Sequence, residues 1–303
     1  MAAKFKLEGK TKAFEDLFRS SEGEITSVSN NIQELPIESL RPYPGHPFKM
    51  YEGERLDRMV ESIRQFGVFT PIAVKAEHPG YIIISGHNRT NAAKLAGLKT
   101  IKAVVLDVDE DEAAQLVVES NFRQRDSLLP SEKALGYKMK YEAMKNQGRR
   151  TDLEGGGIQR QHSHLILGRE SGENGKQIQR YLRIAILNQG LLDLLDNGRL
   201  GFTQALEISY INEAEQKLLL KLLLAENSMK ISLQQAKSIR CLSEDGDFNM
   251  ETLSETILKS SQSVKALKLN FNEISGHLPP GISSTKDIMK YIQEALEYYS
   301  RKE

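Results

Sequence analysis

The chain has 303 residues, 39% of them hydrophobic and 27% charged, so it can bury more than one core. Its formal net charge is zero, which argues against a histone-like protein that coats any polyanion. The single cysteine, Cys241, excludes an internal disulfide and fits a reducing cytosol. The opening residues lack the apolar run of a signal peptide, and Lys221 interrupts the richest apolar run, Leu218 to Ala225, so we expect neither secretion nor membrane insertion.

The N-terminal third of the chain begins with irregular segments. Residues 1–34 have mixed charge and end in a Ser/Asn/Gly-rich stretch, which predicts a mobile arm. The Pro-rich segment LRPYPGHPF, residues 40–48, favours an extended chain over regular helix. From Glu54 the apolar residues fall at helical spacing, and Gly67 is the expected end of that helix.

A strand-rich pattern follows. Two β-rich runs, Pro71–Lys75 and Tyr81–Ser85, flank a turn sequence and predict a hairpin. The second run leads through a glycine into an alanine-rich helix that Gly97 closes, and Ile101–Leu106 is the next predicted strand.

The remainder of the chain is predicted to be mainly helical. Ser131 is the expected cap of a helix after Pro130, and the glycine-rich stretch Gln147–Gln161 predicts a flexible loop. Four further helices are expected around Leu191–Leu195, Thr203–Ile208, Glu213–Ala225 and Ser232–Ile239. From about Asp245, a β-like LKLNF and a final amphipathic helix, Thr285–Tyr299, predict a small separate unit.

The turn after the second strand, Ser85–Arg89, is a candidate phosphate site. Gly86 stands where the buried strand becomes a helix, so unpaired amides and the helix dipole together favour an anion. His87 and Asn88 follow, and Arg89 adds a planar fork for phosphate oxygens. The alternative is an ordinary strand-to-helix turn with a surface arginine, and this short motif does not decide between the two.

A second polar cluster lies at the end of an acidic helix, which is predicted from Asp109 through Val118. Glu119 and Asn121 there offer a carboxylate and an amide for a metal or a phosphate, and Arg125 follows. The alternative is a helix C-terminus that Asn121 caps. Spacing leaves both interpretations open.

The order of these segments from Leu35 to Tyr210 resembles the ParB partition family, in which GVFTPIAV, IISGHNRTNAAKLAGLKTIKAVV and ESNFRQRDSLLPSEKA have counterparts. The family's turn usually reads Gly-Glu-Arg-Arg; Gly86 and Arg89 match its first and last members. The family's later cluster reads Glu-Asn-x-x-Arg; Asn121 matches its asparagine and Arg125 its arginine, but Ser120 separates Glu119 from Asn121 and one extra residue precedes Pro130.

The resemblance implies a CTP site with a magnesium ion. The implied nucleotide-binding residues are Ser85, Gly86, His87, Asn88, Arg89, Glu119, Asn121 and Arg125. Glu119 and Asn121 are the implied metal ligands. Because the departures from the family pattern fall where the metal would be organised, we expect phosphate binding rather than hydrolysis, and at most slow CTPase activity.

A helix-turn-helix is predicted within a basic region. Between Arg123 and Arg183 thirteen basic residues face seven acidic ones, and the segment 163–187 divides into a short helix, a Gly-Glu-Asn turn and a longer helix. The predicted buried stripe of the second helix is Ile178, Leu182, Ala185 and Ile186. The predicted DNA-contacting side chains are Lys176, Gln177, Gln179, Arg180 and Arg183.

Two features of this region favour other interpretations than a DNA-binding motif or a metal site. A plain helical hairpin with a polar face is the alternative, and Gly168 in the first helix costs about 1 kcal/mol relative to alanine. His162 and His164 have neither cysteine nor paired carboxylates nearby, which favours solvated histidines over a metal site.

The sequence thus predicts an α+β N-terminal domain of the ParB and sulfiredoxin-like kind, an all-α helix-turn-helix domain and a small C-terminal unit. The predicted divisions are an arm at 1–34, a nucleotide domain at 35–122, a DNA-binding domain at 123–240 and a C-terminal unit at 241–303.

The resemblance implies a cytoplasmic, nucleoid-associated, homodimeric partition protein that binds a parS-like site in double-stranded DNA and works with a ParA-type ATPase, away from the membrane. It further implies that CTP switches a DNA clamp. Two alternatives are a transcriptional or plasmid-copy regulator without a nucleotide switch and a ParB-like nuclease.

Overall fold

The computed structural model describes residues 32–125, 127–152, 163–225, 230–261, 279, 288–292 and 294–295. These fall into two compact units, divided after Thr256. The predicted arm lies outside the described residues, apart from 32–34, which belong to the first strand. The predicted LKLNF segment and His162 also lie outside them.

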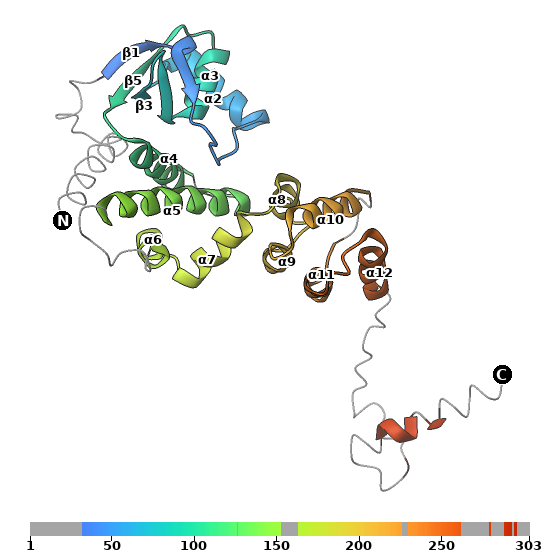
Figure 1. The fold of residues 1–303 in the computed structure, drawn as a ribbon. Coiled ribbons are helices and arrows are strands. Elements are labelled where there is room, and N and C mark those ends of the chain that lie inside the picture. The colour runs from blue at the N-terminus through green and yellow to red at the C-terminus, as the bar shows by residue number, and fades with distance from the viewer. Residues whose placement is uncertain are drawn as a thin grey trace. The chain divides into compact units, whose positions relative to one another are not determined.

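Five strands form a single sheet in the order β1-β5-β3-β4-β2 (Figure 1). Their bounds are β1 (Ile32–Pro36), β2 (Leu40–Pro42), β3 (Ile72–Ala76), β4 (Tyr81–Ser85) and β5 (Thr100–Leu106). β3 pairs antiparallel with β4 and parallel with β5, whereas β1 is antiparallel to β5 and β2 is parallel to β4. The predicted hairpin and third strand are confirmed, and a short 3-10 helix, η2 (Ile37–Ser39), enters the Pro-rich segment.

Each face of the sheet is covered by helices, because successive residues of a strand point to opposite faces. Ile72 and Val74 of β3 pack on one face with α2 (Gly53–Phe66) and α3 (His87–Leu95). Ala73, between them, packs on the other face with α4 (Glu110–Gln124).

The remaining helices follow α4 in chain order (Figure 1). Their bounds are α5 (Pro130–Asp152), α6 (Ser163–Ser171), α7 (Gly175–Ile184), α8 (Gln189–Asp196), α9 (Phe202–Ile208), α10 (Glu213–Ala225), α11 (Leu233–Asp245) and α12 (Met250–Ser261). The four helices predicted between Leu191 and Ile239 are confirmed, and so is the α+β domain followed by a helical region. α12 was not predicted; the Asn249 side chain accepts hydrogen bonds from two amides of its first turn.

The end of α4 and the start of α5 differ from the prediction. α4 continues to Gln124 instead of ending at Val118. Ser131 is not a cap: its amide and hydroxyl both donate to Asp196, while Glu132 accepts from the amide of Leu129. A contact with a residue distant in sequence therefore replaces the local capping box.

α5 also extends further than predicted, to Asp152, into the stretch expected to be a loop. It packs along α4, and Asn146 donates to Asp111 at 3.1 Å near the start of α4. Tertiary contact of this kind offsets the low helix propensity of a glycine. Residues 153–162 of the predicted loop lie outside the described residues.

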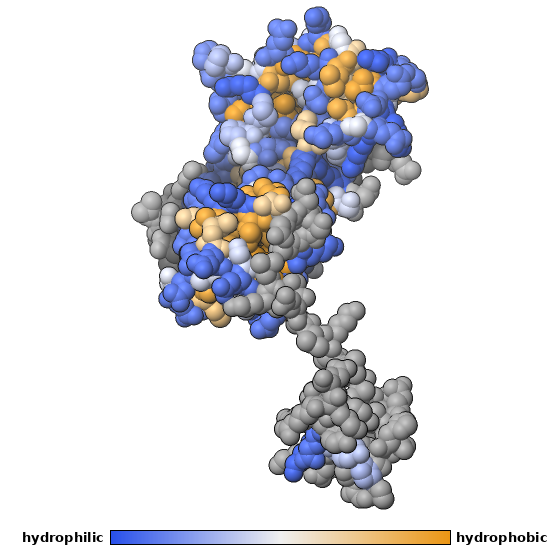
Figure 2. Space-filling model, turned by 90° about the vertical axis from the view of Figure 1, so that its right-hand side faces the viewer, coloured by the Kyte–Doolittle hydropathy of each residue, from blue (hydrophilic) through white to orange (hydrophobic). Residues whose placement is uncertain are grey.

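The face of the molecule shown in Figure 2 intersperses hydrophilic with hydrophobic residues. In the described part of the chain, no helix combines the length and the apolar character needed to cross a membrane.

Candidate nucleotide site and DNA interface

The turn at Gly86 has a geometry that glycine alone tolerates. Its φ of 102° lies in the left-handed region, and a Cβ there would stand 2.5 Å from Cγ2 of Ile72. Gly86 is the N-cap of α3 and has no side chain to accept from the first-turn amides. The hydroxyl of Ser85 is buried and finds no hydrogen-bond partner within the described residues. The turn thus places a helix N-terminus, with no capping side chain, directly after a buried strand, and the dipole of such a terminus favours an anion.

Arg89 attaches this turn to the start of β3. One guanidinium nitrogen donates to the carbonyls of Thr70 and Pro71 at 2.7 and 2.8 Å. Burial lowers the pKa of Arg89 to about 10, so the group is still charged at neutral pH. Arg89 therefore brings a partly buried positive charge to the turn and also fixes the preceding loop.

His87 and Asn88 hold the loop 43–51, which overlaps the Pro-rich segment predicted to be extended. The amide of Tyr43 donates to Nε2 of His87 at 3.2 Å, and the amide of Tyr51 donates to Oδ1 of Asn88 at 2.8 Å. The ring of His46 lies 3.8 Å from the ring of His87, between centroids. Both middle residues of the turn are thereby engaged by the loop.

The two histidines are neutral because they are buried. Burial lowers the pKa of His46 to about 4, against an opposing hydrogen bond with the Phe48 carbonyl. Burial, with a smaller contribution from His46, lowers the pKa of His87 to about 3.

Arg125, from the second predicted cluster, reaches the same loop from the end of α4. Its guanidinium pairs with Glu132 at 2.7 Å and donates to the carbonyl of Lys49 at 2.9 Å. It also lies 5.4 and 5.3 Å from the ring centroids of Phe48 and Tyr51. The structure thus joins the two predicted motifs through the loop 43–51. The aromatic and histidine side chains of PYPGHPF were the available signal for this role.

The implied metal ligands are engaged elsewhere. Glu119 pairs with Lys140 at 2.8 Å, and Lys140 also pairs with Glu170 at 3.1 Å. The side-chain amide of Asn121 donates to the Val117 carbonyl within α4. No group of three or more histidine, cysteine or acidic residues in the described part of the chain is arranged to hold a metal. In this arrangement the residues do not fit a magnesium ion, and metal binding by Glu119 and Asn121 stays a prediction.

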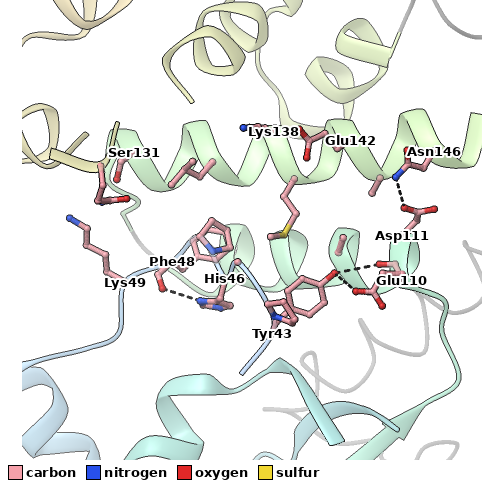
Figure 3. Close-up of a pocket in the computed structure, with 18 residues that line it drawn as sticks. Tyr43, His46, Phe48, Lys49, Glu110, Asp111, Ser131, Lys138, Glu142 and Asn146 are labelled. Atoms are coloured by element: carbon pink, nitrogen blue, oxygen red, sulfur yellow. Dashed lines mark hydrogen bonds between the residues drawn. The ribbon is translucent and has the colours of Figure 1, made fainter. Parts of the chain in front are cut away.

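A cavity of about 660 Å³ lies on the other side of the loop, between residues 43–49, α4 and α5 (Figure 3). Phe48 and Met139 contribute apolar lining, and Lys138, Glu110 and Glu142 contribute charges of both signs. The predicted nucleotide-binding residues are all described, and none of them lines it. The phosphate site predicted at the turn is thus separate from the lining of this cavity, and it stays a prediction.

The predicted helix-turn-helix is present as α6 and α7. Gly172 has a φ of 70° in the turn, and the side chain of Asn174 accepts from the amide of Lys176 to cap α7. Leu167 of α6 and Ile178 of α7 pack together in one buried cluster. The predicted stripe is wrong at its end, because Ile186 is 45% exposed beyond the helix and Ile184 is buried instead.

Four of the five predicted DNA-contacting residues have solvent-accessible side chains, and their contact with DNA stays a prediction. Lys176, Gln179 and Arg180 are exposed, and Gln177 is half-buried with its side chain accepting from Arg180 at 3.4 Å.

Arg183 differs from this pattern, because it is half-buried. Its guanidinium lies 4.3 Å from the ring centroid of Tyr210, and its Nε is buried with no hydrogen-bond partner among the described residues. It therefore packs against the turn between α9 and α10.

Comparison with known proteins extends this description. Residues 21–122 match the family model described as the ParB N-terminal domain. The chain is 31% identical over 228 residues to the probable plasmid-partitioning protein ParB of Thermus thermophilus, covering 68% of this chain and 73% of that protein. It is 29% identical over 224 residues to the chromosome-partitioning protein Spo0J of the same species, covering 74% and 76%.

A solved structure is also similar. It is the C-terminally truncated chromosome-partitioning protein ParB from Caulobacter crescentus, complexed with CTP-gamma-S. The match has 26% identity and a TM-score of 0.29, and it covers 64% of this chain and 98% of that one.

Proposed function

Because the chain belongs to the ParB family of partition proteins, we propose that it is a DNA-binding partition protein whose N-terminal domain binds CTP as a switch. The observation that carries the nucleotide part is the left-handed Gly86 at the start of α3, with Arg89 beside it. Phosphate oxygens would accept from amides at the N-terminus of α3, where the helix dipole adds to the attraction.

The side chains of this chain would share the remaining work. Arg89 would add a charge-assisted hydrogen bond while keeping its bonds to the loop at Thr70 and Pro71. Asn88 and Arg125 both contact the loop 43–51, so a ligand that binds these side chains would change their hydrogen bonds with that loop. In the family a magnesium ion accompanies the nucleotide, and the contacts proposed for Arg89, Asn88 and Arg125 do not involve that ion.

The DNA-reading part of the proposal rests on α7. Its exposed Lys176, Gln179 and Arg180 are the residue types that contact phosphates and base edges in the major groove. A parS-like site in double-stranded DNA is the proposed target. We also propose, from family membership, a cytoplasmic, nucleoid-associated homodimer that works with a ParA-type ATPase, and at most slow CTP hydrolysis.

Calorimetry with CTP on the full chain, with and without its DNA site, tests the nucleotide part. We expect saturable binding that Arg89→Ala weakens by about tenfold or more, since a charge-assisted bond contributes about 1.5–3 kcal/mol. Arg89→Lys should recover only part of the loss, because lysine lacks the planar fork.

CD spectra of each variant check that the fold survives the loss of the bonds to Thr70 and Pro71. If the unmodified protein binds no CTP under either condition, the switch is absent. A regulator that reads DNA without a nucleotide then becomes the better description.

A further inference from the structure

Arg125, which the family resemblance assigns to the nucleotide, is occupied in this structure by a carboxylate of the chain itself. It pairs with Glu132 at 2.7 Å, and the two side chains are only 7% and 3% exposed. Its Nη1 donates to Glu132 and its Nη2 to the carbonyl of Lys49, so the chain itself engages both ends of the guanidinium fork. Glu132 thus lies where an anionic ligand of Arg125 would have to compete.

Glu132 is held firmly in this position. Its Oε1 accepts from the amide of Lys49 at 2.8 Å as well as from Arg125, and its Oε2 accepts from the amide of Leu129 at 2.9 Å. Three hydrogen-bond donors thus fix the position of this buried carboxylate. The carboxylate therefore ties Arg125, the loop 43–51 and the start of α5 together.

The side chain of Lys49 carries this connection to a helix beyond the helix-turn-helix. Its ammonium pairs with Asp193 at 3.1 Å and with Asp196 at 2.9 Å, both on α8. Asp196 is 3% exposed and also accepts two hydrogen bonds from Ser131. Figure 3 shows Lys49 and Ser131 at the same end of α5. The loop at the nucleotide turn is therefore bound, through one lysine, to the helical region.

We propose that Glu132 is a resident anion that competes with nucleotide phosphate for Arg125, so that nucleotide binding loosens the hold of Lys49 on α8. This inference rests on the proposed function, since it concerns the same nucleotide site. A triphosphate bears more charge than a carboxylate and can take the guanidinium. Glu132 then loses its cation, and Lys49 loses the bond from Arg125 to its carbonyl.

Coupling of this kind is reciprocal. Whatever weakens the hold of Glu132 on Arg125, or of Lys49 on α8, strengthens nucleotide binding by the same free energy. A residue with a merely structural role would instead weaken binding when it is replaced. The sign of the change separates the two roles.

Calorimetry with CTP on full-length variants provides the test. Glu132→Gln keeps the side-chain shape and should bind CTP about tenfold tighter, within the usual range of coupling between sites. Lys49→Met leaves the pair of Arg125 and Glu132 in place and should give a smaller gain. Glu173→Gln is the matched control, because it also removes one carboxylate paired to α5, at Lys133, and should leave CTP affinity unchanged.

The outcomes are separable. CTP binding by the unmodified chain, with no gain in natively folded Glu132→Gln, overturns the competition and leaves the proposed function intact. If Glu132→Gln does not fold, an unchanged or weakened affinity in Lys49→Met overturns it equally. No binding by any of the proteins rejects both proposals, and binding by Glu132→Gln alone supports both.

Discussion

Gly168 shows how a single residue can be misjudged from helix propensity alone. It lies inside α6, where glycine is unfavourable, and the sequence analysis treated it as a weak point. In the structure a Cβ at this position would stand 2.8 Å from the carbonyl oxygen of Glu173 and 3.2 Å from the amide nitrogen of Gly175. The close approach of the two helices therefore requires a glycine.

Gly168→Ala is expected to lower the free energy of unfolding by about 1–3 kcal/mol, the usual cost of overpacking. Propensity alone would raise it by about 1 kcal/mol, so the two explanations predict opposite signs. Urea denaturation decides between them. Arg169→Ala, on the exposed side of the same helix, is the control and should change stability by less than about 0.5 kcal/mol.

The stacked histidines predict a pH dependence. Their pKa values in the folded chain, about 4 for His46 and about 3 for His87, lie below the value of about 6.5 expected in the unfolded chain. The unfolded state therefore binds more protons between pH 6.5 and 4. The stability contributed by the neutral pair is fully present above the unfolded value and is lost as pH falls through this window.

Urea denaturation at pH 7.5 and pH 5.5 should show this loss, with about 1.4 kcal/mol per pH unit for each histidine below pH 6.5. His87→Gln retains an acceptor for the Tyr43 amide and should reduce the pH dependence by about half, because one of two such groups is removed. An unchanged slope in that variant would assign the effect to other groups.

At the scale of elements, α7 holds its two arginines in different surroundings. Arg180 is exposed, whereas the guanidinium of Arg183 lies against the ring of Tyr210, which a second guanidinium, from Arg240, approaches to 4.0 Å. Cation–π contact of this kind stabilises packing by roughly 0.5–2 kcal/mol. Arg183 therefore holds the C-terminal end of α7 against the α9–α10 turn.

Arg180→Ala should weaken DNA binding by about 1–3 kcal/mol if Arg180 reads a base, or reduce the salt slope by about one if it holds phosphate. Its thermal stability should stay unchanged. Arg183→Ala should instead lower the melting temperature and weaken DNA binding as a consequence. Anisotropy titrations at several salt concentrations, together with melting curves, compare the two variants. Equal melting temperatures would contradict the packing role of Arg183 and favour a direct contact of Arg183 with DNA.

The elements that local sequence determines were predictable. Gly67, with a φ of 73°, ends α2, and Asp109 forms a capping box with Glu112 at the start of α4. These signals involve residues a few positions apart. The glycine turn at Gly86 belongs to the same class, since the change from strand to helix needs a left-handed residue there.

The contacts around the candidate site were not predictable in this way, because their partners are far apart in sequence. Ser131 has the local signature of a cap but binds Asp196, 65 positions away. Lys49 and Asp193 are separated by 144 positions. Period and propensity carry no information on such pairs, so the role of the loop 43–51 emerged only from the fold.

For the whole molecule, the charge count between Arg123 and Arg183 overstates the charge available to DNA. Arg125, Lys133 and Lys140 pair with carboxylates inside the helical region. Because each of these basic side chains is paired with a carboxylate, it contributes less positive charge to the binding of DNA phosphates. In the described part of this stretch the exposed basic side chains are Arg123 on α4, Lys145 on α5, Arg169 on α6, and Lys176 and Arg180 on α7.

The C-terminal unit offers a test of assembly. In the described residues, 288–292 and 294–295 are helical, Ile288 is 8% exposed, and its neighbour Met289 is 65% exposed. This supports the amphipathic helix predicted for Thr285–Tyr299. Its predicted apolar stripe is Ile288, Ile292, Ala295 and Leu296, of which Leu296 lies outside the described residues. An apolar stripe must be buried either in its own unit or against a second copy.

We predict that the helix serves self-association, because an isolated amphipathic helix gains most of its stability from the surface that it buries. Sedimentation of the full chain should then show a dimer, and a chain that ends before Thr285 should sediment as a monomer. The far-UV CD spectrum of the truncated chain should show that its remaining helices are still folded. Ile288→Asp in the full chain should have the same effect, while Met289→Asp, on the exposed side, serves as the control and should remain dimeric. A truncated chain that still sediments as a dimer would place the interface elsewhere, and a monomeric full chain would refute self-association.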